Sequence, residues 1–356
     1  MFLKKYLSRD FLFKNFYLKF EKDVYYKENK KLFYGSFKFW RILFINIINP
    51  GRFLMRLRYG QLFKNKKKIL LKFKNSLDKI KDDHFNNINQ QEKFLKLSKG
   101  IETLIENGGV VLDSYFTEKE IDEFVNSNKE IISKLKSSEN ISNNARYYFE
   151  ILKLNKELIK FWYEPGLIKM LESYFGKKIY ARNYPYIKYT QVPNDFNTTT
   201  CANDWHADHS LMFNIFILLE DVEKDGTRMQ IKKGSHKYLN TGNFMYSENS
   251  VKNLETIDFY GKKGSIHIHT GNTIHRAKLS NGKNRLNLYF EYTLGPNVLL
   301  NSANLSKALD DNFDIEKLEN LNFEEREFLK GIFPKPLNKG YEVNKDSLNS
   351  TGYKGI

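Results

Sequence analysis

Apolar residues recur at helical spacing over roughly residues 90–175 of the chain. One helix is expected at Ile101–Glu106, and it ends at a Gly-Gly pair that leads into a short strand at Val110–Leu112. A second helix begins at Thr117, because Thr117 and Glu120 have the spacing of a capping box. Helical spacing continues through Ile151–Phe175. This part of the chain therefore predicts a helical flank.

The spacing then changes to the alternation of β-strands. Short runs of alternating residues, separated by Gly, Asn and Pro turns, extend from Ile179 to about Leu294. Helical spacing returns around Ile315–Ile332, and the chain ends in a polar stretch at Asn338–Ile356. A group of helices followed by many short strands predicts a β-sandwich or β-barrel with helices packed outside.

Positive charge is concentrated in the first quarter of the sequence. Residues 1–81 contain 22 Lys and Arg against 5 Asp and Glu, a balance of 22 − 5 = +17, and 19 aromatic residues. The other 275 residues contain 36 Lys and Arg against 37 Asp and Glu, a balance of −1. This change in composition marks a boundary near residue 90.

Three interpretations fit the basic segment 1–81. Its helices can pack on the core formed by the rest of the chain and keep a solvated basic face. They can also bind the surface of an anionic membrane, where basic side chains meet headgroups and aromatic rings lie at the interface. A nucleic-acid surface is the least favoured of the three.

Cysteine content and hydropathy limit the cellular setting. The single cysteine, Cys201, excludes an internal disulfide framework and a cysteine-rich zinc site, and it is expected to be a small core residue. The longest apolar run, Ile42–Ile48, is far shorter than the roughly 20 residues of a membrane span. The N-terminus lacks the apolar stretch and cleavage site of a signal peptide. We expect a cytoplasmic protein, with peripheral membrane contact as the alternative.

The residues that carry chemistry begin at Trp205-His206-Ala207-Asp208. Residues i and i+2 of a strand point to the same face, so His206 and Asp208 can converge on one point. A second imidazole from another strand would complete a face of two histidines and one carboxylate, which suits Fe(II) and leaves positions open for an oxo-acid and O₂. A His-x-Asp pattern alone is weak, but a buried-strand run, Leu211–Leu219, follows this one directly.

Further motifs follow in order along the chain. They are an acidic turn with Gly226, then Gly234-Ser235-His236-Lys237, a Gly-led strand from Gly264 to His269, His275-Arg276, and Arg285. With the WHxD motif, this order resembles the phytanoyl-CoA dioxygenase family over roughly residues 100–295. The resemblance implies a double-stranded β-helix (jelly roll, cupin-like) core, an α+β fold with flanking helices and a basic helical N-terminal region.

The resemblance also implies the site. His206, Asp208 and His275 would be the iron ligands and catalytic residues, and Arg285 would bind the distal carboxylate of 2-oxoglutarate. A guanidinium suits that role because it offers a bidentate fork and keeps its charge. His269 is an alternative third ligand, but the ten-residue spacing from His275 to Arg285 favours His275.

Other residues receive lesser roles. Arg276 should point away from the iron, because it neighbours His275 on a strand, and His209 should point away from Asp208. His236 is expected to be structural. His267 and His269 share one strand face and can line the site or pack beneath it. The segment before Gly234 lacks a proline that often precedes this motif in the family, which does not affect the chemistry.

The implied activity is that of an Fe(II)- and 2-oxoglutarate-dependent dioxygenase, consuming O₂. A carboxylate at Asp208 predicts hydroxylation, because family members that halogenate have a small residue there. The substrate would be a small molecule, or a lipid- or saccharide-linked one. The alternatives are a cupin-like metalloenzyme that does not use 2-oxoglutarate, a non-catalytic binding module, and a membrane-associated adaptor with a vestigial oxygenase domain. The expected domains are the N-terminal region 1–90, the dioxygenase domain 91–300 and a helical extension with a polar tail, 301–356.

Overall fold

The computed structural model describes eleven stretches of the chain. These are residues 66–84, 88–137, 145–148, 158–181, 185–190, 204–208, 212–237, 244–246, 248–280, 283–294 and 322–329. The expectations for residues 1–65, Cys201, His209 and the tail beyond residue 329 lie outside the described residues.

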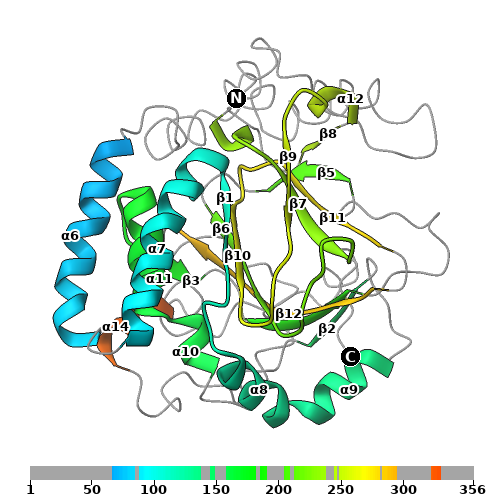
Figure 1. Cartoon of the computed structure of the whole chain (residues 1–356), viewed down its shortest axis with the longest axis horizontal. Helices are drawn as coiled ribbons and strands as arrows, with labels where there is room; N and C mark the ends of the chain where they lie inside the picture. Colours follow the sequence, from blue (N-terminus) through cyan, green and yellow to red (C-terminus); the bar gives the residue numbers. More distant parts are fainter. Residues whose placement is uncertain are drawn as a thin grey trace, which may run out of the picture.

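Helices form a layer on one side of the strands (Figure 1). This layer holds α6 (Lys66–His84), α7 (Ile88–Asn107), α10 (Leu158–Trp162) and α11 (Pro165–Phe175), and α6, α7 and α11 pack on one another. The helices α8 (Glu118–Ser127) and α9 (Lys129–Ser137) follow one another at one end of the molecule.

Capping residues fix where two of these helices begin. Thr117 accepts a hydrogen bond from the Glu120 amide, and the Glu120 carboxylate accepts one from the Thr117 amide, so the predicted capping box of α8 is confirmed. The side chain of Glu164 caps α11 by accepting from the Leu167 amide, and Pro165 occupies the first turn.

The strands form two antiparallel sheets. Among the described residues, the larger sheet has the order β1 (Gly109–Leu112), β10 (Ile266–Thr270), β6 (Met212–Leu218), β12 (Arg285–Thr293), β4 (Tyr186–Thr190) and β2 (Ala145–Tyr148), and β3 (Tyr180–Ala181) also pairs with β12. The smaller sheet has the order β8 (Phe244–Tyr246), β5 (Trp205–Ala207), β11 (His275–Lys278), β7 (Arg228–Lys232) and β9 (Thr256–Phe259). The predicted jelly roll with flanking helices is confirmed.

Short elements complete the described chain. They are the 3₁₀ turn η5 (Ser235–Lys237) and the helices α12 (Glu248–Val251) and α14 (Phe323–Leu329). Phe328 of α14 packs its ring edge-on against Trp162, Tyr163 and Tyr292, so part of the helix expected at 315–332 lies on the core. Strand β2 was not foreseen from the sequence.

Side-chain alternation in the larger sheet separates an apolar face from a polar one. On β12, Leu286, Leu288 and Phe290 belong to the main core that the helices cover, as do Ile266 and Ile268 of β10. The alternate residues face the smaller sheet, where Phe216 and Tyr289 join a second cluster with Met229, Ile231 and Phe259. Polar residues on this inner face are therefore buried between the two sheets.

A glycine sets the close approach of α7 to the site. Gly108 has a φ of 85°, and a Cβ atom there would lie 2.4 Å from His236 Nδ1. Its carbonyl accepts from the Thr273 hydroxyl at 2.6 Å. The Gly-Gly pair thus lets the chain turn from α7 into β1 beside the loop that leads to His275.

Candidate active site

His206, Asp208 and His275 meet between two neighbouring strands of the smaller sheet. His206 lies on β5, Asp208 directly follows that strand, and His275 opens β11. The two strands are antiparallel with His206 opposite His275, and the imidazole centres are 4.2 Å apart. One ligand atom from each of the three side chains lies within 4.8 Å of the others. The structure therefore brings together the three residues that the sequence suggested as ligands.

Backbone carbonyls fix the orientation of both imidazoles. Nδ1 of His206 lies 2.8 Å from the Asp204 carbonyl, and Nδ1 of His275 lies 2.9 Å from the Thr273 carbonyl. A carbonyl only accepts, so each Nδ1 carries a proton and each Nε2 is directed toward the carboxylate of Asp208. The Nε2 atoms lie 3.9 Å from Asp208 Oδ1 and 3.3 Å from Asp208 Oδ2, respectively.

Burial makes this cluster suited to a cation. Burial, together with the nearby His275, lowers the pKa of His206 to about 4, so its Nε2 carries a lone pair at neutral pH. Burial alone would raise the pKa of Asp208, but hydrogen bonding and attraction to the histidines hold it well below its usual range. Two imidazole nitrogens and one ionised carboxylate on one side of a point are the donor set of a non-haem Fe(II) site.

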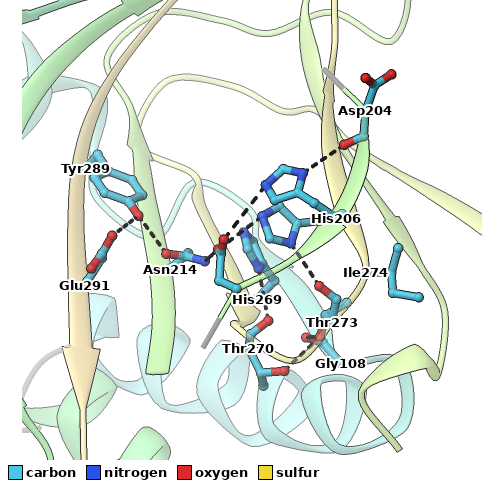
Figure 2. A network of polar contacts seen from close by, with 12 residues as sticks. Gly108, Asp204, His206, Asn214, His269, Thr270, Thr273, Ile274, Tyr289 and Glu291 are labelled. Atoms are coloured by element: carbon cyan, nitrogen blue, oxygen red, sulfur yellow. Dashed lines mark hydrogen bonds and ion pairs between the residues drawn. The ribbon is translucent and has the colours of Figure 1, made fainter. Parts of the chain in front are cut away.

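A hydrogen-bonded chain supports the carboxylate of Asp208 (Figure 2). Asn214 Nδ2 donates to Asp208 Oδ2 at 2.8 Å, and the Tyr289 hydroxyl lies 2.6 Å from both Asn214 Oδ1 and Glu291 Oε1. Burial, with the charge of Glu291, raises the pKa of Tyr289, so the phenol keeps its proton. Sequence reasoning missed Asn214, Tyr289 and Glu291. The signal for Asn214 was a polar residue within an otherwise apolar strand.

The remaining histidines differ in their distance from the cluster. The His269 ring centre lies 4.0 Å from that of His275, so His269 lines the site, but it is not among the three grouped ligands. His267 lies two residues before His269 on the same face of β10, and it packs edge-on against Phe259. His236 holds the α7 end through Nε2, 3.0 Å from the Ile105 carbonyl, which agrees with its expected structural role.

Arg285 of the larger sheet points into the space between the two sheets, whereas Arg276 of the smaller sheet points out of it. Arg285 opens β12 on the inner face, is 2% exposed, and has its guanidinium carbon 5.7 Å from the Phe216 ring centre. Arg276 points away from the site, where Nε donates to Gln230 and the guanidinium stacks on Trp205. Both orientations agree with the expectation from strand alternation.

The charge of Arg285 affects the protonation of the neighbouring His267. Burial, with the positive charge of Arg285 nearby, lowers the pKa of His267 to about 3, so this histidine is neutral. The inner face of the larger sheet therefore presents a guanidinium charge with an uncharged imidazole beside it. A single carboxylate is the matching partner for that charge.

A family model now places this arrangement among known proteins. The model described as "Phytanoyl-CoA dioxygenase (PhyH)" matches residues 104–285, which is 182 of the 356 residues. The chain belongs to the phytanoyl-CoA dioxygenase family. It is an iron- and 2-oxoglutarate-dependent oxygenase, and iron and 2-oxoglutarate are its cofactor and co-substrate. The match spans the whole ligand cluster and ends at Arg285.

Solved structures with weak similarity include other enzymes that use this co-substrate. The α-ketoglutarate-dependent epimerase SnoN from nogalamycin biosynthesis is 15% identical, with a TM-score of 0.46 over 56% of this chain and 83% of that chain. The carbocyclase SnoK from the same biosynthesis is 15% identical, with a TM-score of 0.42 over 55% and 83%. EctD from S. alaskensis is 12% identical, with a TM-score of 0.43 over 55% and 76%.

No curated protein matches the sequence significantly. Within the described part of this family member, none of the helices combines the length and the apolar character that crossing a bilayer requires.

Proposed function

We propose that this oxygenase hydroxylates a small-molecule substrate, free or linked to a lipid or saccharide. One observation carries the proposal: the carboxylate of Asp208 stands in the same ligand group as His206 and His275. These three side chains would hold an Fe(II) ion, and such a donor set suits an iron that also binds 2-oxoglutarate and O₂.

The roles of the ligands follow from their protonation. His206 and His275 would bind the iron through Nε2, because their Nδ1 protons are donated to backbone carbonyls. Asp208 contributes the negative charge, and Asn214 keeps the carboxylate turned toward the imidazoles. When bound, the iron couples the oxidative decarboxylation of 2-oxoglutarate by O₂ to oxidation of a substrate C–H bond.

Arg285 is the proposed anchor for the distal carboxylate of 2-oxoglutarate. Its guanidinium is buried on the inner face of the larger sheet, between the same two sheets as the ligand cluster. A guanidinium binds a carboxylate through two parallel hydrogen bonds and remains charged when buried. This interaction would orient the co-substrate with its oxo-acid end toward the iron.

Hydroxylation is preferred over halogenation because of the ligand at position 208. A carboxylate occupies the place that a halide would need beside 2-oxoglutarate and O₂. The alternative of a cupin-like enzyme without 2-oxoglutarate is disfavoured by the family membership.

A succinate-release screen tests the proposal. The full chain, loaded anaerobically with Fe(II), is exposed to O₂ and 2-oxoglutarate with a panel of candidate substrates. We expect substrate-stimulated succinate release and a product heavier by one oxygen atom, both lost in Asp208→Ala. A product altered without gain of an oxygen atom, such as an epimer or a ring-closed compound, would contradict hydroxylation and show that the enzyme catalyses another oxidation.

The domain division is also proposed. Residues 91–300 would form the catalytic domain, 1–90 a basic N-terminal region and 301–356 a C-terminal extension. Within the N-terminal region, Ile69, Phe73 and Leu77 of α6 are buried in the main core. Helix α6 would therefore attach the N-terminal region to the catalytic domain.

Peripheral membrane contact is a second proposal, and the exposed side of α6 favours it. Lys66, Lys68 and Lys74 are exposed there together with Leu71, which is 60% exposed. Basic residues near an anionic surface contribute about 1 kcal/mol each. Sedimentation with phosphatidylserine-containing vesicles should carry the protein down at low salt and release it above roughly 0.5 M salt, where screening is short-ranged. Protein that stays in the supernatant at low salt would exclude the membrane role.

A further inference from the structure

The outer face of the smaller sheet carries an aromatic and a charged side chain directly behind the two ligand histidines. Trp205 precedes His206 on β5, and Arg276 follows His275 on β11. His206 pairs with His275 in an antiparallel register, so Trp205 lies opposite Arg276 on the neighbouring strand. Successive residues of a strand point to opposite faces. The side chains of Trp205 and Arg276 therefore lie on the face away from the ligand cluster.

Main-chain pairing between these two strands is short. Strand β5 shares three residue pairs with the edge strand β8, and β11 shares four with β7. In the described part of the chain, β5 and β11 share one pair, His206 with His275. The strands β8 and β5 therefore form a two-stranded margin of the sheet (Figure 1), joined to the other three strands at the β5–β11 junction. The spacing of the two imidazoles depends on this junction.

The side chain of Arg276 connects the two sides of the β5–β11 junction. Its guanidinium carbon lies 4.1 Å from the centre of the Trp205 ring, which is a cation–π contact with β5. Its Nε donates to Gln230 Oε1 on β7 at 2.8 Å. Its Nη1 forms an ion pair with Glu248 of α12, the helix that follows β8. One side chain thus holds β5, β7 and α12 to β11.

The indole of Trp205 is contacted by a second cation. Lys232 Nζ lies 4.6 Å from the same ring centre, although Lys232 belongs to β7, on the far side of β11. Its ammonium group donates to Thr256 Oγ1 at 2.8 Å and to the Leu254 carbonyl at 3.2 Å, which fixes its position. Trp205 is 2% exposed and Lys232 is 5% exposed. Cation–π contacts are stronger when they are removed from water, so the burial of this indole strengthens the junction.

We propose that Arg276 is a positioning residue for the iron site. By stacking on Trp205 it keeps β5 against β11, and it thereby keeps His206 at the distance from His275 at which one ion can bind both Nε2 atoms. The two imidazole centres lie 4.2 Å apart. Removal of a group that orients a metal ligand from behind costs roughly 10- to 100-fold in metal affinity. This inference rests on the proposed roles of His206 and His275 as ligands.

The test replaces Arg276 by leucine, which removes the guanidinium and retains an apolar side chain. Fe(II) affinity of the full chain is measured by anaerobic competition with a colorimetric chelator, and ligand geometry is measured by the visible absorption spectrum of the Co(II)-loaded protein. Arg276→Leu should weaken Fe(II) binding about tenfold and shift the Co(II) bands. Arg276→Lys keeps a cation that can lie over the indole, so it should recover most of the affinity and the spectrum of the unmodified protein.

Arg228→Leu is the matched control. Arg228 lies on the same outer face, its side chain is 15% exposed against 17% for Arg276, and its Nε donates to Asp258. It belongs to β7, which is separated from β5 by β11. Arg228→Leu should therefore lower the melting temperature but leave the Fe(II) affinity and the Co(II) spectrum unchanged.

A second variant tests the same role without replacing a part-buried group. The Glu248 side chain is 67% exposed, and Glu248→Gln removes the charge that holds the Arg276 guanidinium. This variant should shift the Co(II) bands in the same direction as Arg276→Leu. It should weaken Fe(II) binding by about two- to threefold, a smaller loss because the stack on Trp205 remains.

The outcomes separate this inference from the proposed ligand set. Unchanged Fe(II) affinity and an unchanged Co(II) spectrum in Arg276→Leu would overturn the inference and leave the ligand roles in place. An equal loss in Arg228→Leu would also overturn it, because general destabilisation would then explain the effect. His206→Ala should lose Fe(II) binding at concentrations where Arg276→Leu still binds the ion. If His206→Ala binds Fe(II) as the unmodified protein does, the ligand assignment fails, and the inference fails with it.

Discussion

Replacing Asn214 by leucine probes how the protein holds its metal-binding carboxylate. The substitution removes one hydrogen bond of 2.8 Å between a neutral amide and an ionised carboxylate, at a residue that is 1% exposed. Hydrogen bonds to charged groups contribute about 1.5–3 kcal/mol. Tyr289 still has Glu291 within 2.6 Å, so the substitution leaves no new unpartnered phenol. The main effect of the substitution is therefore that the Asp208 carboxylate loses a hydrogen-bond donor.

The expected result is a loss of iron affinity. A change of 1.4 kcal/mol is a factor of ten in binding, so Asn214→Leu should weaken Fe(II) binding roughly 10- to 100-fold. An anaerobic competition titration with a colorimetric chelator measures this change directly. Asn128→Leu is a matched control, because Asn128 is also buried and donates a 2.8 Å bond, to the Phe124 carbonyl of α8. It should lower stability and leave iron affinity unchanged.

The reasoning would be refuted by two results. One is Fe(II) affinity within twofold of the unmodified protein in Asn214→Leu. The other is an equal loss in Asn128→Leu, which would trace the effect to general destabilisation. Tyr289→Phe should give a smaller loss than Asn214→Leu, since it removes only the group that orients the amide.

Three further predictions concern the co-substrate, the reaction and pH. Arg285→Leu should weaken 2-oxoglutarate binding by roughly 1.5–3 kcal/mol in calorimetry with iron content intact, and unchanged affinity would move the anchoring role elsewhere. Turnover should be insensitive to chloride and give no chlorinated product by mass spectrometry, because Asp208 fills the halide position; a chlorinated product would contradict this. Burial lowers the pKa of His236 to about 4 from an ordinary value of 6.5, so the unfolded chain binds its proton first as pH falls. The free energy of unfolding should then decrease between about pH 6.5 and pH 4, by roughly 3 kcal/mol from this residue. His236→Asn should reduce the slope of that part of a urea-denaturation profile, to which the other buried histidines also contribute.

The order of elements and the ligand cluster were predictable because both depend on local spacing. Strand alternation alone places His206 and Asp208 on one face, and it also turns Arg276 away from His275. The distance from His275 to Arg285 distinguished His275 from His269. In the structure, His275 lies in one group with His206 and Asp208, and His269 is not part of that group.

Residues that depend on register between distant strands could not be predicted. Tyr289 reaches Asn214 only because β12 lies beside β6, across 75 residues of sequence. The neighbouring positions of Thr190 and Arg285 result from pairing across 95 residues of sequence. Strand β2 was missed because its four residues, Ala145–Tyr148, show little alternation, and pairing with β4 defines it.

The central claim is that iron is bound by His206, Asp208 and His275. Anomalous diffraction at the iron edge, on crystals of the full chain grown anaerobically with Fe(II) and 2-oxoglutarate, tests it most directly. A single peak is expected within bonding distance of both Nε2 atoms and of an Asp208 carboxylate oxygen, with the co-substrate on the opposite side. A peak bonded to His269 in place of His275, or one away from these three residues, would contradict the account.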